Sequence, residues 1–196
     1  MNRDRRTPRS RERSSGEPVR PLSEALRESI LNAWTTNDRT TIFLVERLPA
    51  AVLAAKIPGE PQKTVRMLAA HIHNARRMWL RTLGAPHGIA VPAAVDRRRV
   101  RPAELVRALK ISGRAMSRLL ELGLDHGGRI PPTKVYIWRN LPLDVGHVLS
   151  YFVAHEGHHR GQIVMLARQL GHRLPREVTY GLWQWSTRVR EARERA

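Results

Sequence analysis

The sequence predicts an all-α protein in which four long helices form a bundle. Apolar residues recur every three or four positions in four long segments, as they do along the buried face of a helix. Loops that contain Gly and Pro separate these segments, and no segment shows the sustained alternation of a β-strand. Aromatic residues make up only 5% of the chain, and most apolar residues are Leu, Val, Ile and Ala. This composition favours helices over sheets.

The expected helices follow a polar N-terminal tail. Residues 1–21 are rich in Arg, Ser and Pro and hold too few apolar residues to form a core, so we expect a disordered basic tail. The folded domain should span residues 22–190. We expect its long helices at residues 23–48, 64–83, 102–122 and 143–170, the last three ended by Gly84, Gly123 and Gly171. A short C-terminal helix should begin at Glu177.

The composition excludes several kinds of site. The chain has no cysteine, which rules out disulfides, iron–sulfur clusters and a thiolate nucleophile of its own. The N-terminus lacks the apolar segment of a signal peptide, and no apolar run reaches about 20 residues, so we expect a cytoplasmic protein with no membrane partner. The net charge of +18 makes nucleic acid a partner to consider. The basic residues are scattered, however, and we interpret most of them as solvated helix faces.

Two histidines on the last long helix are candidate metal ligands. The segment AHEGHHRGQIVML places His155, His158 and His159 within five positions. At roughly 100° per residue, His155 and His159 lie one turn apart within or beside the apolar stripe, and His158 points outside it. Two neutral imidazoles at positions i and i+4 can reach one cation, and burying both without a metal costs desolvation energy. The alternative is a pair of ordinary histidines satisfied by hydrogen bonds.

The second long helix supplies the candidate third ligand. His71 falls on the wider part of its buried stripe, whereas His73 faces away from that stripe, so His71 is favoured and His73 is the alternative. Three histidines leave an open coordination position, which is typical of a catalytic or substrate-binding metal. We expect one divalent ion. Zinc suits three imidazoles best, and nickel, iron and manganese are also compatible.

The residues between and after the paired histidines allow further interpretations. His155 to His159 also match HExxH, the zinc-peptidase motif, in which Glu156 would be the general base and Glu177 a downstream ligand. We discount a peptidase because the motif is short and a helical chain lacks a strand-lined cleft. Glu156 still falls inside the apolar stripe, so it is a candidate for proton transfer or for supporting the ligands, with a buried arginine partner as the alternative. Arg160 is expected to face solvent, the alternative being contact with an anionic cofactor group.

Two segments resemble one known family. DVGHVLSYFVAHEGHHRGQIVMLARQLG resembles the C-terminal metal-binding helix of the DinB/YfiT-like metalloenzymes, which carries HxxxH followed by RGQ and a closing LG. MLAAHIHNARRMWLRTLG resembles the other ligand segment of the family, in which a His precedes a Trp-containing stretch. The resemblance covers most of residues 22–190. The HIHN pair and the Arg-rich tail depart from the family pattern.

The resemblance implies a more specific architecture and activity. It implies an up-down-down-up four-helix bundle, metal ligands at His71, His155 and His159, and a homodimer. Some relatives are thiol S-transferases that use bacillithiol or mycothiol, others are hydrolases or isomerases, and many have no assigned activity. We therefore expect a metal-dependent enzyme that activates water or a low-molecular-weight thiol on a small-molecule substrate. The alternative from another class is a non-catalytic basic module that binds nucleic acid.

Overall fold

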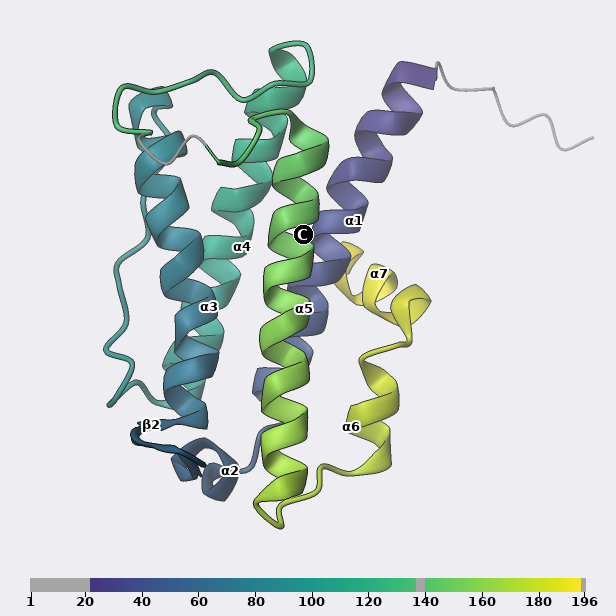
Figure 1. The fold of residues 1–196 in the computed structure, drawn as a ribbon. Helices are drawn as coiled ribbons and strands as arrows, with labels where there is room; N and C mark the ends of the chain where they lie inside the picture. The colour runs from purple at the N-terminus through teal and green to yellow at the C-terminus, as the bar shows by residue number, and fades with distance from the viewer. Residues whose placement is uncertain (1–21, 137–139, 195–196) are drawn as a thin grey trace, which may run out of the picture.

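The computed structural model describes residues 22–136 and 140–194, and four long helices dominate its architecture (Figure 1). These helices are α1 (Leu22–Glu46), α3 (Val65–Trp79), α4 (Pro102–Asp125) and α5 (Val145–Gln169). They match the four expected segments closely, which confirms the all-α prediction. The tail that we expected to be disordered, residues 1–21, lies outside the described residues. No described helix combines the length and the apolar character needed to span a membrane.

The long helices follow one another in up-down-down-up order, which confirms the topology that the resemblance implied. After α3 the chain forms a π-helical turn, η1 (Leu80–Gly84), and a 3-10 turn, η2 (Ala85–His87). Residues 88–101 then run back along the outside of the bundle, so α4 begins at the same end as α3 (Figure 1). As a result α3 and α4 are parallel, and α1 and α5 run in the opposite direction.

The connection between α1 and α3 has structure of its own. It contains the short helix α2 (Ala50–Ala54) and the strands β1 (Lys56–Ile57) and β2 (Glu60–Thr64), which pair in antiparallel fashion. Gly59 makes the tight turn between the strands possible because its φ of +76° is costly for any residue with a side chain. This hairpin leads directly into α3, where the Thr64 hydroxyl caps the helix by accepting a hydrogen bond from the Met67 amide.

The C-terminal segment forms two short helices, so the expected single helix from Glu177 is wrong in this respect. The helices are α6 (Arg176–Gly181) and α7 (Trp185–Arg193). Gly181 lies against Phe43 of α1, where an added Cβ would come within 2.3 Å of the ring. The chain turns after this contact, and α7 then packs on α1 through an ion pair between Arg39 and Glu191. Periodicity along one segment does not reveal these contacts with α1.

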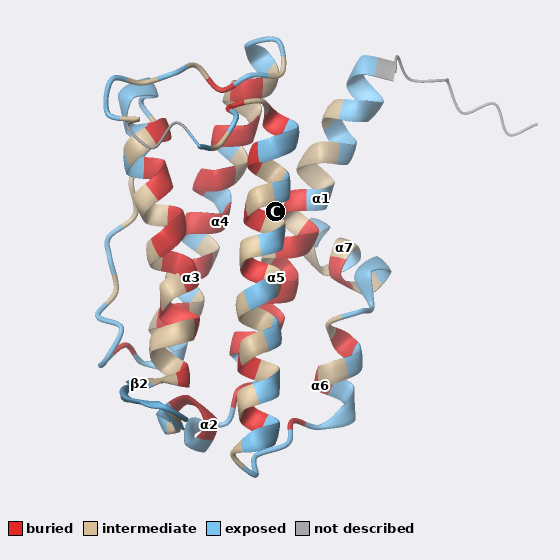
Figure 2. Ribbon diagram, in the orientation of Figure 1, coloured by how far each residue is buried: buried red, intermediate tan, exposed pale blue. Residues whose placement is uncertain are grey.

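Two apolar clusters form the core, and a polar layer separates them. Buried residues of the four long helices face one another along the bundle (Figure 2). The cluster on the hairpin side includes Ile42, Ile72, Leu109 and Ile163, and the other includes Trp34, Trp79, Met116 and Phe152. Between them, each long helix buries polar side chains, among them Asn37 and Thr41 of α1, His73 and Arg76 of α3, Ser112 of α4, and Glu156 of α5.

Candidate metal centre

Three histidines from two helices meet at the level of the polar layer. His71 comes from α3, and His155 and His159 come from α5. Each offers one ring nitrogen, and these three atoms lie within 4.8 Å of one another. All three side chains are half-buried, so they are shielded from bulk water yet remain reachable. The structure thus brings together the three histidines that the sequence selected.

The spacing of the nitrogens fits one divalent ion. Nε2 of His155 and Nε2 of His159 are 3.2 Å apart. Two nitrogens bound to a tetrahedral zinc ion at about 2.0–2.1 Å each would lie about 3.3 Å apart. The ring centroid of His71 lies 5.3 Å from that of His155 and 4.8 Å from that of His159, so the third imidazole faces the other two across the α3–α5 contact.

Neighbouring side chains fix the orientation of the two α5 histidines. Nδ1 of His159 donates to Oε1 of Gln162 at 2.8 Å, which leaves the lone pair of Nε2 for a cation. Tyr151 stacks on His155 with ring centroids 5.9 Å apart and ring planes at 15°. Nδ1 of His155 is buried and has no hydrogen-bond partner among the described residues. This atom is not the ring nitrogen that faces His159, so it lies outside the space between the three imidazoles.

The electrostatic surroundings keep all three imidazoles neutral. Burial is the largest effect on each, and it lowers the pKa of His71, His155 and His159 below the usual value. The neighbouring histidines lower the pKa of His155 further, to about 4. Because only a neutral imidazole can bind a metal, the three side chains are ready to act as ligands at neutral pH.

The remaining candidate histidines lie outside the cluster. His73 is fully buried, with one ring nitrogen 3.1 Å from Oγ of Ser112 and the other 2.9 Å from the Ala93 carbonyl oxygen. Our prediction that His73 faces away from the buried side is wrong, because α4 and the 88–101 crossover both cover this side of α3. Hydrogen bonds therefore satisfy His73. His158 is exposed, and so is Glu177, which lies on α6 and is not part of the histidine cluster.

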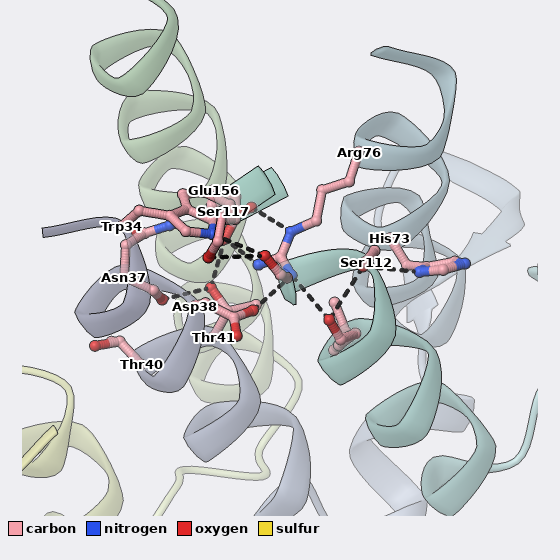
Figure 3. A network of polar contacts seen from close by, with 12 residues as sticks. Trp34, Asn37, Asp38, Thr40, Thr41, His73, Arg76, Ser112, Ser117 and Glu156 are labelled. Carbon is pink, nitrogen blue, oxygen red and sulfur yellow. Dashed lines mark hydrogen bonds and ion pairs between the residues drawn. The ribbon is translucent and has the colours of Figure 1, made fainter. Parts of the chain in front are cut away.

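Glu156 forms a buried ion pair with Arg76 at the centre of the polar layer (Figure 3). Its Oε1 accepts a hydrogen bond from Nε of Arg76 at 2.6 Å, and its Oε2 accepts one from Nη2 at 2.8 Å. Asn37 and Thr41 of α1 also donate to Oε2, at 3.0 Å and 2.8 Å. Burial alone would raise the pKa of Glu156, but the charge and hydrogen bonds of Arg76, the charge of Arg160 and the hydrogen bond from Thr41 together lower it. This is the arginine pairing that the sequence left as the alternative to proton transfer.

A second carboxylate and a second arginine complete the layer. Nη1 of Arg76 donates to Oδ1 of Asp38 at 2.6 Å, and burial raises the pKa of Asp38 to about 6 against the opposing charge of Arg76. The side chain of Arg160 is only 11% exposed, and its Nη1 donates to Asn37 and Thr41. The expectation that Arg160 faces solvent is therefore wrong. It fails because α1 packs against this part of α5.

A pocket of about 460 Å³ opens beside His71 and His159. Apolar side chains such as Leu68 and Leu166 form part of its wall. Arg97, from the crossover, also lines the pocket. Its positive charge adds to the effects of burial and of His159 that lower the pKa of His71. A small molecule in this pocket would contact both the imidazoles and a positive charge.

The sequence analysis missed the partners of Glu156. Periodicity along a single helix cannot show that Arg76 of α3 and Asn37 of α1 converge on one carboxylate of α5. One signal was present, however. The run TTNDRTT at residues 35–41 places polar residues in the middle of α1, at positions where the flanking turns have apolar ones. A polar run of this kind inside an amphipathic helix indicates a buried hydrogen-bonding layer.

Two family models match the chain. The model described as the DinB superfamily matches residues 33–163, which include His71, His155 and His159. The model described as the DinB family matches residues 133–194, which include α5 to α7. No curated protein and no solved structure matches the chain. Because the superfamily match extends over well more than half of the sequence, and the observed bundle agrees with it, the chain belongs to the DinB superfamily.

Proposed function

We propose that this protein binds one divalent metal ion through His71, His155 and His159 and uses it to act on a small molecule. The observation that carries the proposal is the cluster itself, in which three neutral imidazoles from two helices offer nitrogens within 4.8 Å of one another. Membership of the DinB superfamily supports it. Zinc is our first choice for the ion because a site of three imidazoles suits it, and nickel, iron and manganese are compatible.

The reaction we propose is attack by water or by a low-molecular-weight thiol, as in hydrolysis or thiol transfer. A bound divalent ion with an open position would lower the pKa of either nucleophile toward neutrality. The residues of the chain position and shield the reactants. Gln162 holds the ring of His159, Tyr151 covers one face of His155, and apolar side chains line the adjoining pocket.

The pocket beside the histidines favours a substrate or thiol that carries an anionic group. Arg97 lines this pocket and lies close enough to His71 to lower the pKa of that imidazole. Lys63 also lines it, but an ion pair with Glu60 already offsets its charge. Arg97 is therefore the side chain that we assign to the anionic group.

We assign Glu156 a positioning role in place of the proton-transfer role considered from the sequence. Arg76, Asn37 and Thr41 occupy its carboxylate oxygens, so the group is held in its ionised form. Since Glu156 is adjacent to His155 on α5, its contacts to α1 and α3 fix the rotation of α5 and hence the direction of the imidazole.

Cobalt substitution tests the proposal directly. Co²⁺ added to the metal-free protein should give visible absorption bands that reach an endpoint near one equivalent, and His71→Ala should abolish them. A small thiol such as mercaptoacetate should then add a near-ultraviolet sulfur-to-cobalt band. His73→Ala, or His73→Gln if the smaller side chain unfolds the protein, is the matched control and should retain both signals. Absence of the visible bands in the wild-type protein would contradict the proposal.

A further inference from the structure

A second hollow lies on the other side of α5 from the histidines. It has a volume of about 430 Å³ and is bordered by α5, α6, the start of α7 and Thr40 of α1; in Figure 1, α6 and α7 lie on the side of α5 away from α3. We call it the C-terminal groove. Among its lining residues only Met165 also lines the pocket beside the histidines. The two hollows are therefore separate sites on opposite faces of one helix.

Two glycines open the floor of the C-terminal groove. Gly157 and Gly161 lie one turn apart on α5, and both line the groove. A Cβ added at residue 161 would meet nothing within 4 Å, and one added at residue 157 would meet only Nη2 of Arg160, at 3.7 Å. The missing side chains leave a bare helical surface on which a flat or elongated molecule can lie, and they bring Nη2 of Arg160 to that surface.

Two arginines give the groove a positive charge. Nη1 of Arg160 is held by Asn37 and Thr41, whereas its Nη2 has no hydrogen-bond partner among the described residues. Arg168 lines the groove two turns further along α5 and is exposed. None of the described residues that line the groove is acidic. Nη1 of Arg160 also lies 3.8 Å from Oε2 of the buried Glu156, which offsets part of its charge. An anion bound in the groove would therefore be held by Nη2 of Arg160 and by the exposed Arg168.

The wall opposite α5 is apolar and exposed. Trp183 and Trp185, in and after the turn between α6 and α7, line the groove and are 81% and 47% exposed. Tryptophan is rarely left so open to water, and large exposed aromatic side chains that border a hollow are typical of binding sites. Their flat rings suit an apolar or aromatic body rather than an inorganic anion.

We propose that the C-terminal groove binds a small organic anion with an apolar body, such as an aromatic or medium-chain carboxylate. Arg160 and Arg168 hold the charged group, and the tryptophans and the glycine surface enclose the apolar part. The proposal does not depend on a metal at the histidines.

Two dyes that differ by one sulfonate group test the proposal. Anilinonaphthalenesulfonate is an apolar anion whose fluorescence rises in apolar sites, and phenylnaphthylamine has the same rings without the sulfonate. The wild-type protein should bind the sulfonate at one site at least about tenfold more tightly than the neutral dye, because charge-assisted hydrogen bonds select the anion. Decanoate should displace the dye, and decanol should not.

Two variants locate the site. A Cβ at residue 161 meets open space, so Gly161→Leu should fill the groove and abolish saturable dye binding. Ala154→Leu places the same side chain at an exposed α5 position that does not line the groove, and it should leave dye binding intact. Arg168→Gln should weaken the sulfonate roughly fivefold and leave the neutral dye unaffected, as expected for one partly exposed charge. Arg107→Gln removes an exposed charge on α4 and should change neither affinity.

Three results would overturn the proposal. The first is equal affinity for the charged and neutral dyes, and the second is a Gly161→Leu protein that binds the sulfonate as well as wild type. The third is a pair of results: Gly161→Leu converts a dimer to a monomer, and Arg168→Gln leaves the dye affinity unchanged. Together they would identify the groove as an interface between two copies of the chain. His155→Ala/His159→Ala should leave dye binding intact, so failure of the metal proposal stays distinguishable from failure of this one.

Discussion

At the scale of single residues, the environment of each ionisable side chain decides what it can do. The imidazoles of His71, His155 and His159 are neutral because burial, and to a smaller extent repulsion from neighbouring histidines, lowers their pKa values. Glu156 keeps its charge despite complete burial because the positive charges of Arg76 and Arg160 and the hydrogen bonds to its oxygens lower its pKa. The middle of the bundle therefore holds two kinds of polar group. The three neutral imidazoles are free to bind a cation, whereas the Glu156 carboxylate is already paired with arginine.

Metal affinity should persist to lower pH than for ordinary histidines. Protons compete with a metal only below the pKa of each ligand, and here the pKa of His155 is lowered to about 4 and those of the other two are lowered as well. Cobalt titrations between pH 5 and pH 7.5 should show substantial affinity at pH 6, below the usual histidine pKa of about 6.5. A steep loss of affinity that begins at pH 7 would contradict this account.

The same shifts predict how the stability of the metal-free protein depends on pH. The unfolded histidines take up protons near pH 6.5, whereas the folded ones take them up only at lower pH, so between these values the unfolded state binds more protons. The contribution of these histidines to stability is therefore fully present above about pH 6.5 and is lost as pH falls toward 4.

Glu156→Gln should destabilise the fold strongly. The substitution leaves Arg76 buried with half of its compensating charge removed, and breaking a buried pair in this way typically costs about 3–5 kcal/mol. Urea unfolding measures the change. Glu60→Gln is the matched control because Glu60 forms an exposed ion pair with Lys63, and its loss should cost under about 1 kcal/mol. Similar small effects for both variants would disprove the role assigned to the polar layer.

At the scale of helices, close approach between α1 and α4 depends on one glycine. Gly113 of α4 lies against Asp38 of α1, and an added Cβ would come within 2.4 Å of its carboxylate oxygen. The Gly113 carbonyl oxygen also accepts a hydrogen bond from Nε1 of Trp34 at 2.9 Å. The two helices are therefore held at a separation that leaves no room for a methyl group.

Alanine at two helical glycines should have opposite effects. Gly113→Ala should destabilise by about 1–3 kcal/mol because it forces α1 and α4 apart. Gly161→Ala should stabilise by about 0.5–1 kcal/mol, because its Cβ meets open space and alanine is the better helix former. Thermal or urea unfolding of both variants gives the comparison. If Gly113→Ala leaves the free energy of unfolding unchanged, α1 and α4 do not approach each other as closely as described.

The elements also show what the sequence could and could not predict. The four long helices were predictable because each repeats its apolar positions over many turns, and the i, i+4 spacing alone brought His155 and His159 together. His73 was misjudged because the crossover, which has no periodicity, covers its side of α3. The pairing of Arg76 with Glu156 joins residues 80 positions apart, and Gly181, before α7, lies against Phe43 of α1. Features that arise from contacts between distant segments leave no pattern within one segment.

At the scale of the whole molecule, the proposed metal site joins two helices that are separate in the sequence. His71 is on α3, and His155 and His159 are on α5, so an ion at this cluster would bind the folded chain and have no such site in the unfolded one. The homodimer and nucleic-acid binding through the +18 charge stay predictions. The three histidines come from one chain, so the proposed metal site requires neither a dimer nor nucleic acid.

Metal loading should therefore raise the thermal stability. At a free zinc concentration about one hundred times the dissociation constant, the stabilisation is about 2.7 kcal/mol, which corresponds to a rise in Tm of roughly 5–10 °C for a chain of this size. Calorimetry with and without zinc measures the rise. The His155→Ala protein should show none, and a zinc-dependent rise of equal size in that variant would place the ion elsewhere.

The most direct test of the account is elemental analysis of the purified, untagged protein beside a His155→Ala/His159→Ala double variant. The account predicts close to one equivalent of a divalent metal per chain in the wild-type protein and a near-complete loss in the variant. A wild-type protein that holds no metal, even after reconstitution with zinc, nickel, iron and manganese, would contradict it.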